Sequence, residues 1–300
     1  MRLVSFALGG RRTYGFVQGT RVVPKDSVST DLPESITSLI ASSVLVQPPD
    51  LAGCASLAIE ELHLFAPLAD SKVICAGVNY ASHRSEAAID AERPEFPTIF
   101  TRYPDSLVGS GEDIVLPNMC AAFDYEGELA VVIGKSAWRV PEEKAMDHVF
   151  GYSCFNDGTA RDWQRHSSQW TLGKNFSRSG SMGPQIVTCD EILSIAQSRL
   201  TTRVNGDLRQ SARVGEMLFS IAELVAYVSS VTPLSPGDVL ATGTPAGVGA
   251  FMEPPTMLEP GDVVEVEIEG VGLLVNKVAA ETTAHAKVDL RLVNELSRAE

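Results

Sequence analysis

Phe-Asp-Tyr-Glu-Gly-Glu-Leu-Ala-Val-Val-Ile-Gly, residues 123–134, is the stretch that decides the fold of this chain. The apolar run 129–133 predicts a strand that is covered on both faces. Side chains alternate along a strand, so Glu126 and Glu128 should point to the same side. Two like charges on a buried strand are costly unless a positive charge lies between them. Carboxylate oxygens suit Mg²⁺, Mn²⁺ or Ca²⁺, and the pair therefore indicates a metalloenzyme.

The same spacing occurs again in residues 265–269, Glu-Val-Glu-Ile-Glu. There the acids alternate with apolar residues, which predicts an ordinary strand with one wet face. Most Glu-x-Glu pairs are of this ordinary kind. The pair Glu126 and Glu128 differs for two reasons. An uninterrupted apolar run follows it, and a third acid, Asp157, is a candidate ligand of the same metal.

Composition limits the classes of function. The 300 residues form one large domain or two modest ones, and 44% hydrophobic residues can fill a substantial core. The formal charge of −14 argues against nucleic acid and anionic membrane surfaces as partners. A small anionic substrate remains compatible, because local cations set the field inside a cleft.

Cysteine usage and the N-terminus predict a cytoplasmic protein. Five cysteines, an odd number without a CxxC pair, argue against structural zinc and a disulfide framework. Residues 1–10 have no long apolar core, so no signal peptide is expected. No apolar run approaches the ~18–20 residues that span a bilayer.

The chain divides at about residue 70. Residues 1–70 predict a small α+β module, with strands at 3–8, 13–17 and 21–23 and a helix at 35–45 capped by Ser35. From residue 71 onward strand signals recur to Val278, which predicts a mainly β domain.

Two further signals lie in the second half. Ser220 and Glu223 form a capping box, and Phe219 could pack on Leu224, so a helix should begin here. The phrase Leu-x-Pro-Gly-Asp-Val occurs at 234–239 and 258–263 and predicts two matched turns that each start a strand.

Asp157 ends a mostly apolar stretch, and Arg161 and Gln164 follow at +4 and +7. On a helix these three would share a face, although an Asp-x-x-x-Arg pair is usually a surface ion pair. Lys174 follows in Gly-Lys-Asn, where a solvated loop lysine is the simpler reading.

His83 and Glu86 are three residues apart, which brings them together on a helical turn. A carboxylate beside imidazole raises its basicity, as a general base requires, but a casual surface pair has the same spacing. Thr244 lies in the glycine-rich segment 242–249, which fits close approach to a ligand or a plain turn.

Together these segments resemble the fumarylacetoacetate hydrolase family over residues 72–278. The matching phrases, in the order of that family, are Gly77-Val78-Asn79-Tyr80 with His83 and Glu86, Asp124-Tyr125-Glu126-Gly127-Glu128, Asn156-Asp157 with Arg161 and Gln164, Gly173-Lys174, Pro236-Gly237-Asp238 and Gly243-Thr244-Pro245.

The resemblance implies a mixed β-sheet roll as the catalytic domain, at 71–290, and a homodimer. It implies Mg²⁺ or Mn²⁺ held by Glu126, Glu128 and Asp157, with Ca²⁺ as a substitute in crystals. Arg161, Gln164, Lys174 and Thr244 match positions that hold the oxo-carboxylate end of a substrate, and His83 and Glu86 match a dyad that activates water.

The chain departs from the family pattern at two loops. Arg102-Tyr103 stands where Lys-Pro is common, and Ser177 and Ser181 replace Asp and Pro. We expect these loops to shape the pocket, with Arg102 and Tyr103 in contact with the substrate.

The expected activity is hydrolysis of a C–C bond in a β-diketo acid, such as an acylpyruvate or a fumarylacetoacetate-like compound of aromatic catabolism. His83 would deprotonate a water, a divalent cation would polarise the oxo-acid, and Lys174 would help stabilise the expelled enolate. An oxo-acid decarboxylase or tautomerase is the alternative within the family. A non-catalytic, metal-stabilised binding protein is the alternative from another class.

Overall fold

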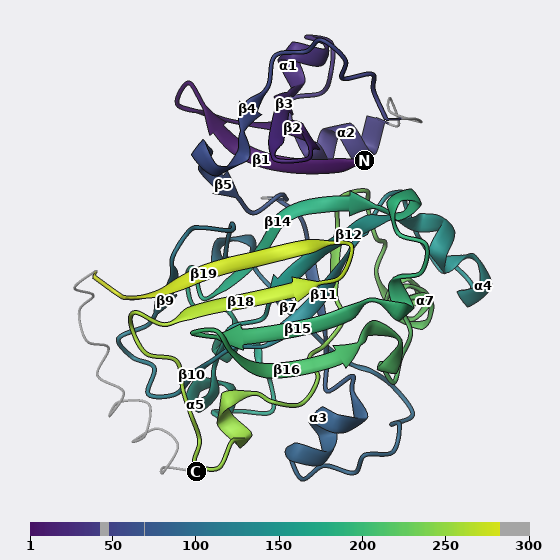
Figure 1. The fold of residues 1–300 in the computed structure, drawn as a ribbon. Coiled ribbons are helices and arrows are strands. Elements are labelled where there is room, and N and C mark those ends of the chain that lie inside the picture. Colours follow the sequence, from purple (N-terminus) through teal and green to yellow (C-terminus); the bar gives the residue numbers. More distant parts are fainter. Residues whose placement is uncertain (43–47, 69, 283–300) are drawn as a thin grey trace, which may run out of the picture.

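Two large β-sheets form most of the structure, a computed structural model that describes residues 1–42, 48–68 and 70–282 (Figure 1). Pairing is mostly antiparallel, but β17 (Val239–Ala241) and β6 (Val73–Gly77) run parallel. The predicted class, mainly β with some α and a mixed sheet, is confirmed. No helix in the described ranges is long and apolar enough to span a membrane.

The N-terminal strands follow the predicted glycine-separated pattern. β1 (Arg2–Leu8), β2 (Arg11–Gln18) and β3 (Arg21–Pro24) form an antiparallel meander. Gly9 and Gly19 lie in its two turns with φ of 57° and 61°, a region that glycine enters without a steric cost. The other short elements of this part are α1 (Lys25–Val28), β4 (Leu57–Ala58) and β5 (Leu64–Phe65).

The predicted N-terminal helix forms as α2 (Ile36–Ser42). The Ser35 hydroxyl accepts a hydrogen bond from the Ser38 N–H at 3.1 Å, as expected for a capping residue. Leu39 and Ile40 of this helix are buried. The last predicted positions of this helix, 43–45, lie outside the described residues.

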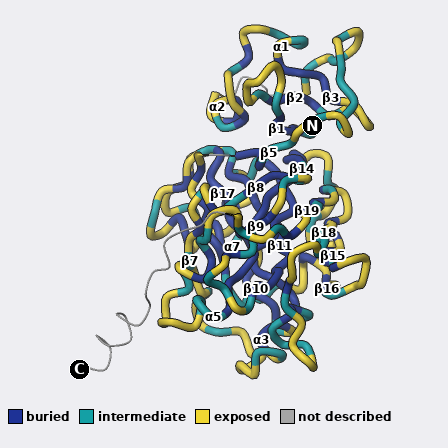
Figure 2. The backbone as a smooth tube through the Cα atoms, turned by 90° about the vertical axis from the view of Figure 1, so that its left-hand side faces the viewer, coloured by how far each residue is buried: buried dark blue, intermediate teal, exposed yellow. Residues whose placement is uncertain are grey.

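The larger sheet has 12 strands, and β11 (Gly127–Ile133) lies inside it between β12 (Val149–Asn156) and β17. Every residue of β11 is buried, as the apolar run predicted (Figure 2). Glu126 directly precedes this strand. The order of strands along the sheet is β4-β3-β2-β1-β14-β12-β11-β17-β6-β7, where β14 is Gly180–Thr188 and β7 is Thr98–Arg102. A further short strand, β8 (Leu107–Val108), pairs with β14.

The second sheet, β16-β15-β18-β19-β9, packs against β11 and β12. Leu129 and Val131 of β11 share one apolar cluster with Leu200, Val266 and Leu274 of this sheet. Its strands are β9 (Ile114–Leu116), β15 (Arg199–Val204), β16 (Asp207–Arg213), β18 (Val263–Ile268) and β19 (Gly272–Ala280); β10 (Phe123–Asp124) and β13 (Thr159–Ala160) form a separate short pair.

The Glu-x-Glu strand of this sheet is the ordinary one. In β18 the residues Val264, Val266 and Ile268 are buried, whereas Glu267 is exposed. The wet face predicted for residues 265–269 is confirmed, and the metal interpretation applies to residues 126 and 128 alone.

The capping box is confirmed at the start of α7 (Ile221–Val231). The Ser220 hydroxyl accepts from the Glu223 N–H, and the Glu223 carboxylate accepts from the Ser220 N–H at 2.8 Å. Phe219 and Leu224 belong to one apolar cluster, as expected for a hydrophobic staple. The remaining helices are short: α3 (Ala81–Glu86), α4 (Glu142–Ala145), α5 (Arg161–Gln164) and α6 (Thr171–Lys174).

The repeated Pro-Gly-Asp phrase forms the same device twice. Gly237 and Gly261 have φ of 90° and 106°, which only glycine adopts readily. The carboxylate of Asp238 accepts from the N–H three residues earlier at 2.7 Å, and that of Asp262 does so at 2.8 Å. Strands β17 and β18 begin directly afterwards.

The N-terminal module and the rest of the chain share a sheet and a core. Leu3 of β1 pairs with Ile186 of β14. Leu3 and Phe16 also belong to the apolar cluster that contains Val239. The predicted boundary at residues 70–71 therefore marks a change in sequence character, and strand pairing continues across it. Positions 283–290 of the predicted second domain lie outside the described residues.

Candidate active site

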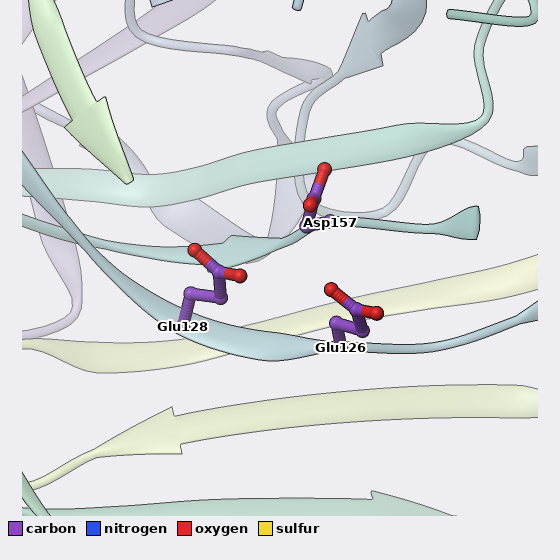
Figure 3. Close-up of side chains that lie close together, drawn as sticks. All are labelled: Glu126, Glu128 and Asp157. Carbon is purple, nitrogen blue, oxygen red and sulfur yellow. The ribbon is translucent and has the colours of Figure 1, made fainter. Parts of the chain in front are cut away.

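Three acids meet where strands β11 and β12 lie side by side. The Asp157 N–H donates to the Glu126 carbonyl at 2.8 Å, which places the residue after β12 next to the residue before β11. Glu126, Glu128 and Asp157 are buried, and one oxygen of each lies within 4.8 Å of the others (Figure 3). The structure thus brings together the three predicted metal ligands.

Buried cations offset most of this charge. Lys174 Nζ lies 2.7 Å from Glu126 Oε2 and also contacts Asp157 Oδ2. Arg161 Nη1 donates to Glu126 Oε1 at 2.6 Å, and Arg102 Nη1 donates to Asp157 Oδ1 at 2.7 Å. The sequence did not predict that Lys174 would lie between two of the acids.

Glu126 and Glu128 differ sharply in their electrostatic surroundings. Burial opposes ionisation of Glu126, but Lys174 and Arg161 outweigh it and lower its pKa to about 2. For Glu128, burial and then the charges of Asp157 and Glu126 raise the pKa well above its usual value. Within the described ranges Glu128 has no ion pair with a cationic side chain, and its Oε2 accepts from the Gly243 N–H at 2.8 Å.

This donor set fits a divalent cation. Three carboxylates supply hard oxygen donors, which Mg²⁺ and Mn²⁺ prefer. The buried, unpaired carboxylate of Glu128 is the group that a cation at this position would stabilise most. Glu126, Glu128 and Asp157 are the residues that would hold it.

The predicted pair of His83 and Glu86 forms on α3. His83 Nδ1 lies 2.7 Å from Glu86 Oε1, and Glu86 Oε2 accepts from the Gly247 N–H at 2.8 Å. The His83 ring also lies 6.0 Å from the Phe251 ring, centroid to centroid. Glu86 therefore orients the imidazole through Nδ1 and ties α3 to the glycine-rich segment.

The segment before α3 is anchored by one buried side chain. Asn79 Nδ2 donates to the carbonyls of Phe219 and Thr242, at 3.0 and 2.8 Å, and Asn79 Oδ1 accepts from the Phe219 N–H at 2.8 Å. These bonds place the start of α3 beside β17, so the sequence Gly-Val-Asn-Tyr positions His83 through Asn79.

A cavity of about 290 Å³ opens between these groups. Both polar and apolar side chains line it. The polar ones include Glu126, Glu128, Arg161, Gln164, Lys174, His83 and Thr244, and the apolar ones include Val78, Ile89, Phe100, Trp170 and Phe251. This mixed lining suits a small acid.

Arg161 lines this cavity, and one of its guanidinium donors has no partner in the described residues. Its Nε donates to Asp124 Oδ2 at 2.9 Å, and its Nη1 donates to Glu126 and, at 3.2 Å, to Gln164 Oε1. Its Nη2 is buried and has no hydrogen-bond partner in the described part of the chain. A buried guanidinium donor without a partner is costly, and a ligand carboxylate would satisfy it.

Thr244 lines the cavity, but its hydroxyl is already engaged. It donates to the Gly127 carbonyl at 2.9 Å and accepts from Gln210 Nε2 at 2.7 Å. In this arrangement Thr244 fixes the backbone between the two glutamates. A substrate contact of its side chain remains a prediction.

Arg102 and Tyr103 do not lie on the cavity wall. The Arg102 guanidinium is buried behind Asp157, where it also donates to the Gly158 carbonyl and to Ser179 Oγ. Tyr103 is 56% exposed. The predicted substrate contacts of this pair do not fit the placement, because the charge of Arg102 is used to hold Asp157.

Two features of the site escaped the sequence analysis. Asp124 accepts from Arg161 and from the N–H groups of Gly249 and Ala250, at 2.8 and 2.9 Å. It lies two residues before Glu126, so its position on the same side of the chain was a usable signal. Trp170 packs on Phe100 with ring centroids 5.5 Å apart. This contact joins residues far apart in the sequence, so no local pattern predicts it.

Known proteins resemble this chain over most of its length. The family model "Fumarylacetoacetate (FAA) hydrolase C-terminal" matches residues 72–279. The oxaloacetate tautomerase YisK of Bacillus subtilis is 42% identical over 236 residues, which cover 77% of this chain and 78% of the relative. The human mitochondrial oxaloacetate tautomerase FAHD2A is 36% identical over 289 residues, which cover 93% and 91%.

Solved structures agree with these relatives. A fumarylacetoacetate hydrolase of Exiguobacterium antarcticum has a TM-score of 0.83 and 38% identity, and a maleylpyruvate hydrolase of Sphingobium sp. SYK-6 has 0.77 and 28%. Each comparison covers 94% of this chain and all of the other.

Proposed function

The chain belongs to the fumarylacetoacetate hydrolase family, and from that premise we propose that it is a metal-dependent tautomerase of a short 2-oxo acid, with oxaloacetate as the first candidate. The names of the relatives favour this alternative over the C–C hydrolysis that the sequence analysis expected. The observation that carries the proposal is the buried Arg161 Nη2, which has no partner among the described residues, next to a cluster of three buried acids of which Glu126 and Glu128 line the cavity.

Arg161 would bind the substrate carboxylate. Its Nε and Nη1 are fixed by Asp124 and Glu126, so Nη2 is presented in one orientation. A carboxylate there gains a charge-assisted hydrogen bond and removes the cost of the unsatisfied donor. Gln164, which is held to the same guanidinium, borders this contact.

A divalent cation held by Glu126, Glu128 and Asp157 would supply Lewis-acid polarisation of the 2-oxo group, which makes the neighbouring C–H more acidic. His83 would carry the proton. Because Nδ1 faces Glu86, Nε2 is the nitrogen left to accept the proton from C3. Return of that proton to the oxo oxygen completes the enol and restores neutral imidazole.

Lys174 sets the charge of the site. Its ammonium group contacts Glu126 and Asp157 and leaves Glu128 without a cationic partner in the described ranges. It therefore keeps the acid cluster from expelling an anionic substrate, while Glu128 is left to bind the metal on losing its proton.

C–C hydrolysis remains the second candidate, and the His83–Glu86 pair is the observation that favours it. The same imidazole nitrogen that removes a C3 proton could remove one from water. Incubation of the protein and Mg²⁺ with oxaloacetate, acylpyruvates and fumarylacetoacetate-like diketo acids, followed by product identification, separates the two. Cleaved products with no change in keto–enol equilibration would reject the tautomerase assignment.

Assembly as a homodimer is also proposed, on the family resemblance alone. Light scattering at micromolar concentration should give twice the 32.1 kDa chain mass. A monomer mass would reject it.

A further inference from the structure

One cation of the active-site cavity is not used by the acids. Arg161 and Lys174 line this cavity, and both are paired with buried carboxylates. Arg165 lines it too; its side chain is exposed, and its guanidinium has no ion pair or hydrogen bond in the described ranges. Its backbone N–H donates to the Asp162 carbonyl at 3.2 Å, so the position of its backbone is fixed.

The spacing of Arg165 relates it to the proposed carboxylate site. Arg161, Gln164 and Arg165 follow one another at i, i+3 and i+4 on the turn of α5 and its C-terminal cap, and all three line the cavity. Residues at these spacings lie on one face, with Cβ atoms about 5–6 Å apart. A second arginine thus stands one helical turn from Arg161 on the wall of the same cavity.

We propose that Arg165 binds the distal carboxylate of the substrate and makes the site selective for 2-oxo dicarboxylates over 2-oxo monocarboxylates. This inference rests on the proposed function, because it takes Arg161 as the anchor of the oxo-carboxylate end. It adds the residue that would recognise the second carboxylate and set the preference for diacids: the two carboxylates would be bound by two arginines of one turn.

The same cavity also offers a site for a substrate without a second carboxylate. Phe100 and Trp170, which pack on one another, and Phe251 also line it and offer apolar surface to an uncharged tail. A substrate with such a tail would not depend on Arg165. Charge at the distal end of the ligand is thus the variable to test.

The test measures binding of two ligands that cannot enolise. N-oxalylglycine and N-methyloxamate share an oxo-carboxylate end, and only N-oxalylglycine carries a distal carboxylate. Calorimetric titration in the presence of Mg²⁺ should show that Arg165→Gln weakens N-oxalylglycine about 10-fold, the effect of one charge-assisted hydrogen bond. Binding of N-methyloxamate should not change.

Two further variants control for charge. Arg165→Lys keeps a cation and should lose less affinity than Arg165→Gln. Arg11→Gln removes an exposed arginine from β2 and should leave both ligands unaffected. Equal loss for both ligands, no loss for N-oxalylglycine, or no binding of N-oxalylglycine to the unaltered protein would each overturn the inference.

Turnover separates this inference from the proposed function. With oxaloacetate, Arg165→Gln should raise KM about 10-fold and leave kcat nearly unchanged. If the unaltered protein binds N-oxalylglycine through Arg165 but does not tautomerise oxaloacetate, the proposed function fails and the diacid site stands. If oxaloacetate turns over with the same KM in Arg165→Gln, the inference alone fails.

Discussion

The ammonium group of Lys174 lies 2.7 Å from Glu126 Oε2, and both side chains are buried. The same group contacts Asp157, so one cation serves two of the three acids. Glu128 has no ion pair with a cationic side chain in the described ranges, and burial, followed by the charges of Asp157 and Glu126, raises its pKa well above the usual value. The site is therefore balanced for Glu126 and Asp157 and incomplete at Glu128, which is the arrangement a bound cation would complete.

Lys174→Met should destabilise the metal-free protein strongly. Removing one partner of a buried ion pair leaves uncompensated charge, which costs about 3–5 kcal/mol. Mg²⁺ should recover part of this loss, because it would take over the compensation. Urea unfolding with and without Mg²⁺ measures both effects. The control is Lys277→Met, which replaces an exposed lysine. A loss below that of Lys277→Met would contradict the account.

Glu128→Gln should have opposite effects on stability and activity. Burial and then the charges of Asp157 and Glu126 raise the pKa of Glu128, which costs folding free energy at neutral pH; a neutral amide avoids this cost, so the metal-free protein should melt higher. A gain of about 1 kcal/mol corresponds to roughly 1.5–2 °C in a chain of this size. The rise in Tm on adding Mg²⁺ should disappear together with activity. Calorimetry tests this, and a lower metal-free Tm would count against the electrostatic account.

Asp124→Asn should impair substrate binding without removing the metal site. Asp124 holds the Nε of Arg161 and the N–H groups of Gly249 and Ala250, so its loss should loosen the guanidinium and the segment that carries Phe251. We expect kcat/KM to fall about 10-fold, mainly through KM. Mg²⁺ affinity measured by calorimetry should stay close to that of the exposed control Asp113→Asn. An unchanged KM would show that Arg161 needs no such support.

His83→Ala should abolish most catalysis and spare metal binding. Loss of a general base typically costs about 10²–10⁴-fold in rate, and imidazole is not among the three ligands. Glu86→Gln should cost less, since it keeps the shape of the side chain that orients His83. The exposed control is His63→Ala. Tautomerisation at the unaltered rate in His83→Ala would remove this residue from the mechanism.

Much of the fold could be predicted from patterns among residues close together in the sequence. Two predictions depended only on residues close together in the sequence, and both are confirmed. One is the buried strand that follows Glu126 and contains Glu128, and the other is the capping box at Ser220. The Pro-Gly-Asp turns are local as well, because Gly237 and Asp238 set the conformation by themselves. Such features can be read from the sequence because the interacting groups are neighbours along the chain.

Long-range placement was the part that the sequence could not supply. Arg102 was expected in the substrate pocket, but β7 brings it behind Asp157, 55 residues away along the chain. Nothing near Lys174 announced that it would join Glu126 and Asp157. The pairing of β1 with β14 across the predicted domain boundary has the same origin, since strand partners distant in sequence leave no local signal.

The most direct test of the central claim is the rate at which enol and keto oxaloacetate interconvert, followed by enol absorbance with saturating Mg²⁺. The account predicts a rate proportional to protein concentration and well above that of Mg²⁺ alone. Chelation or Glu128→Gln should abolish it, and His83→Ala should reduce it about 10²–10⁴-fold. A rate no higher than that of Mg²⁺ alone, or one that survives excess chelator in metal-free protein, would contradict the account.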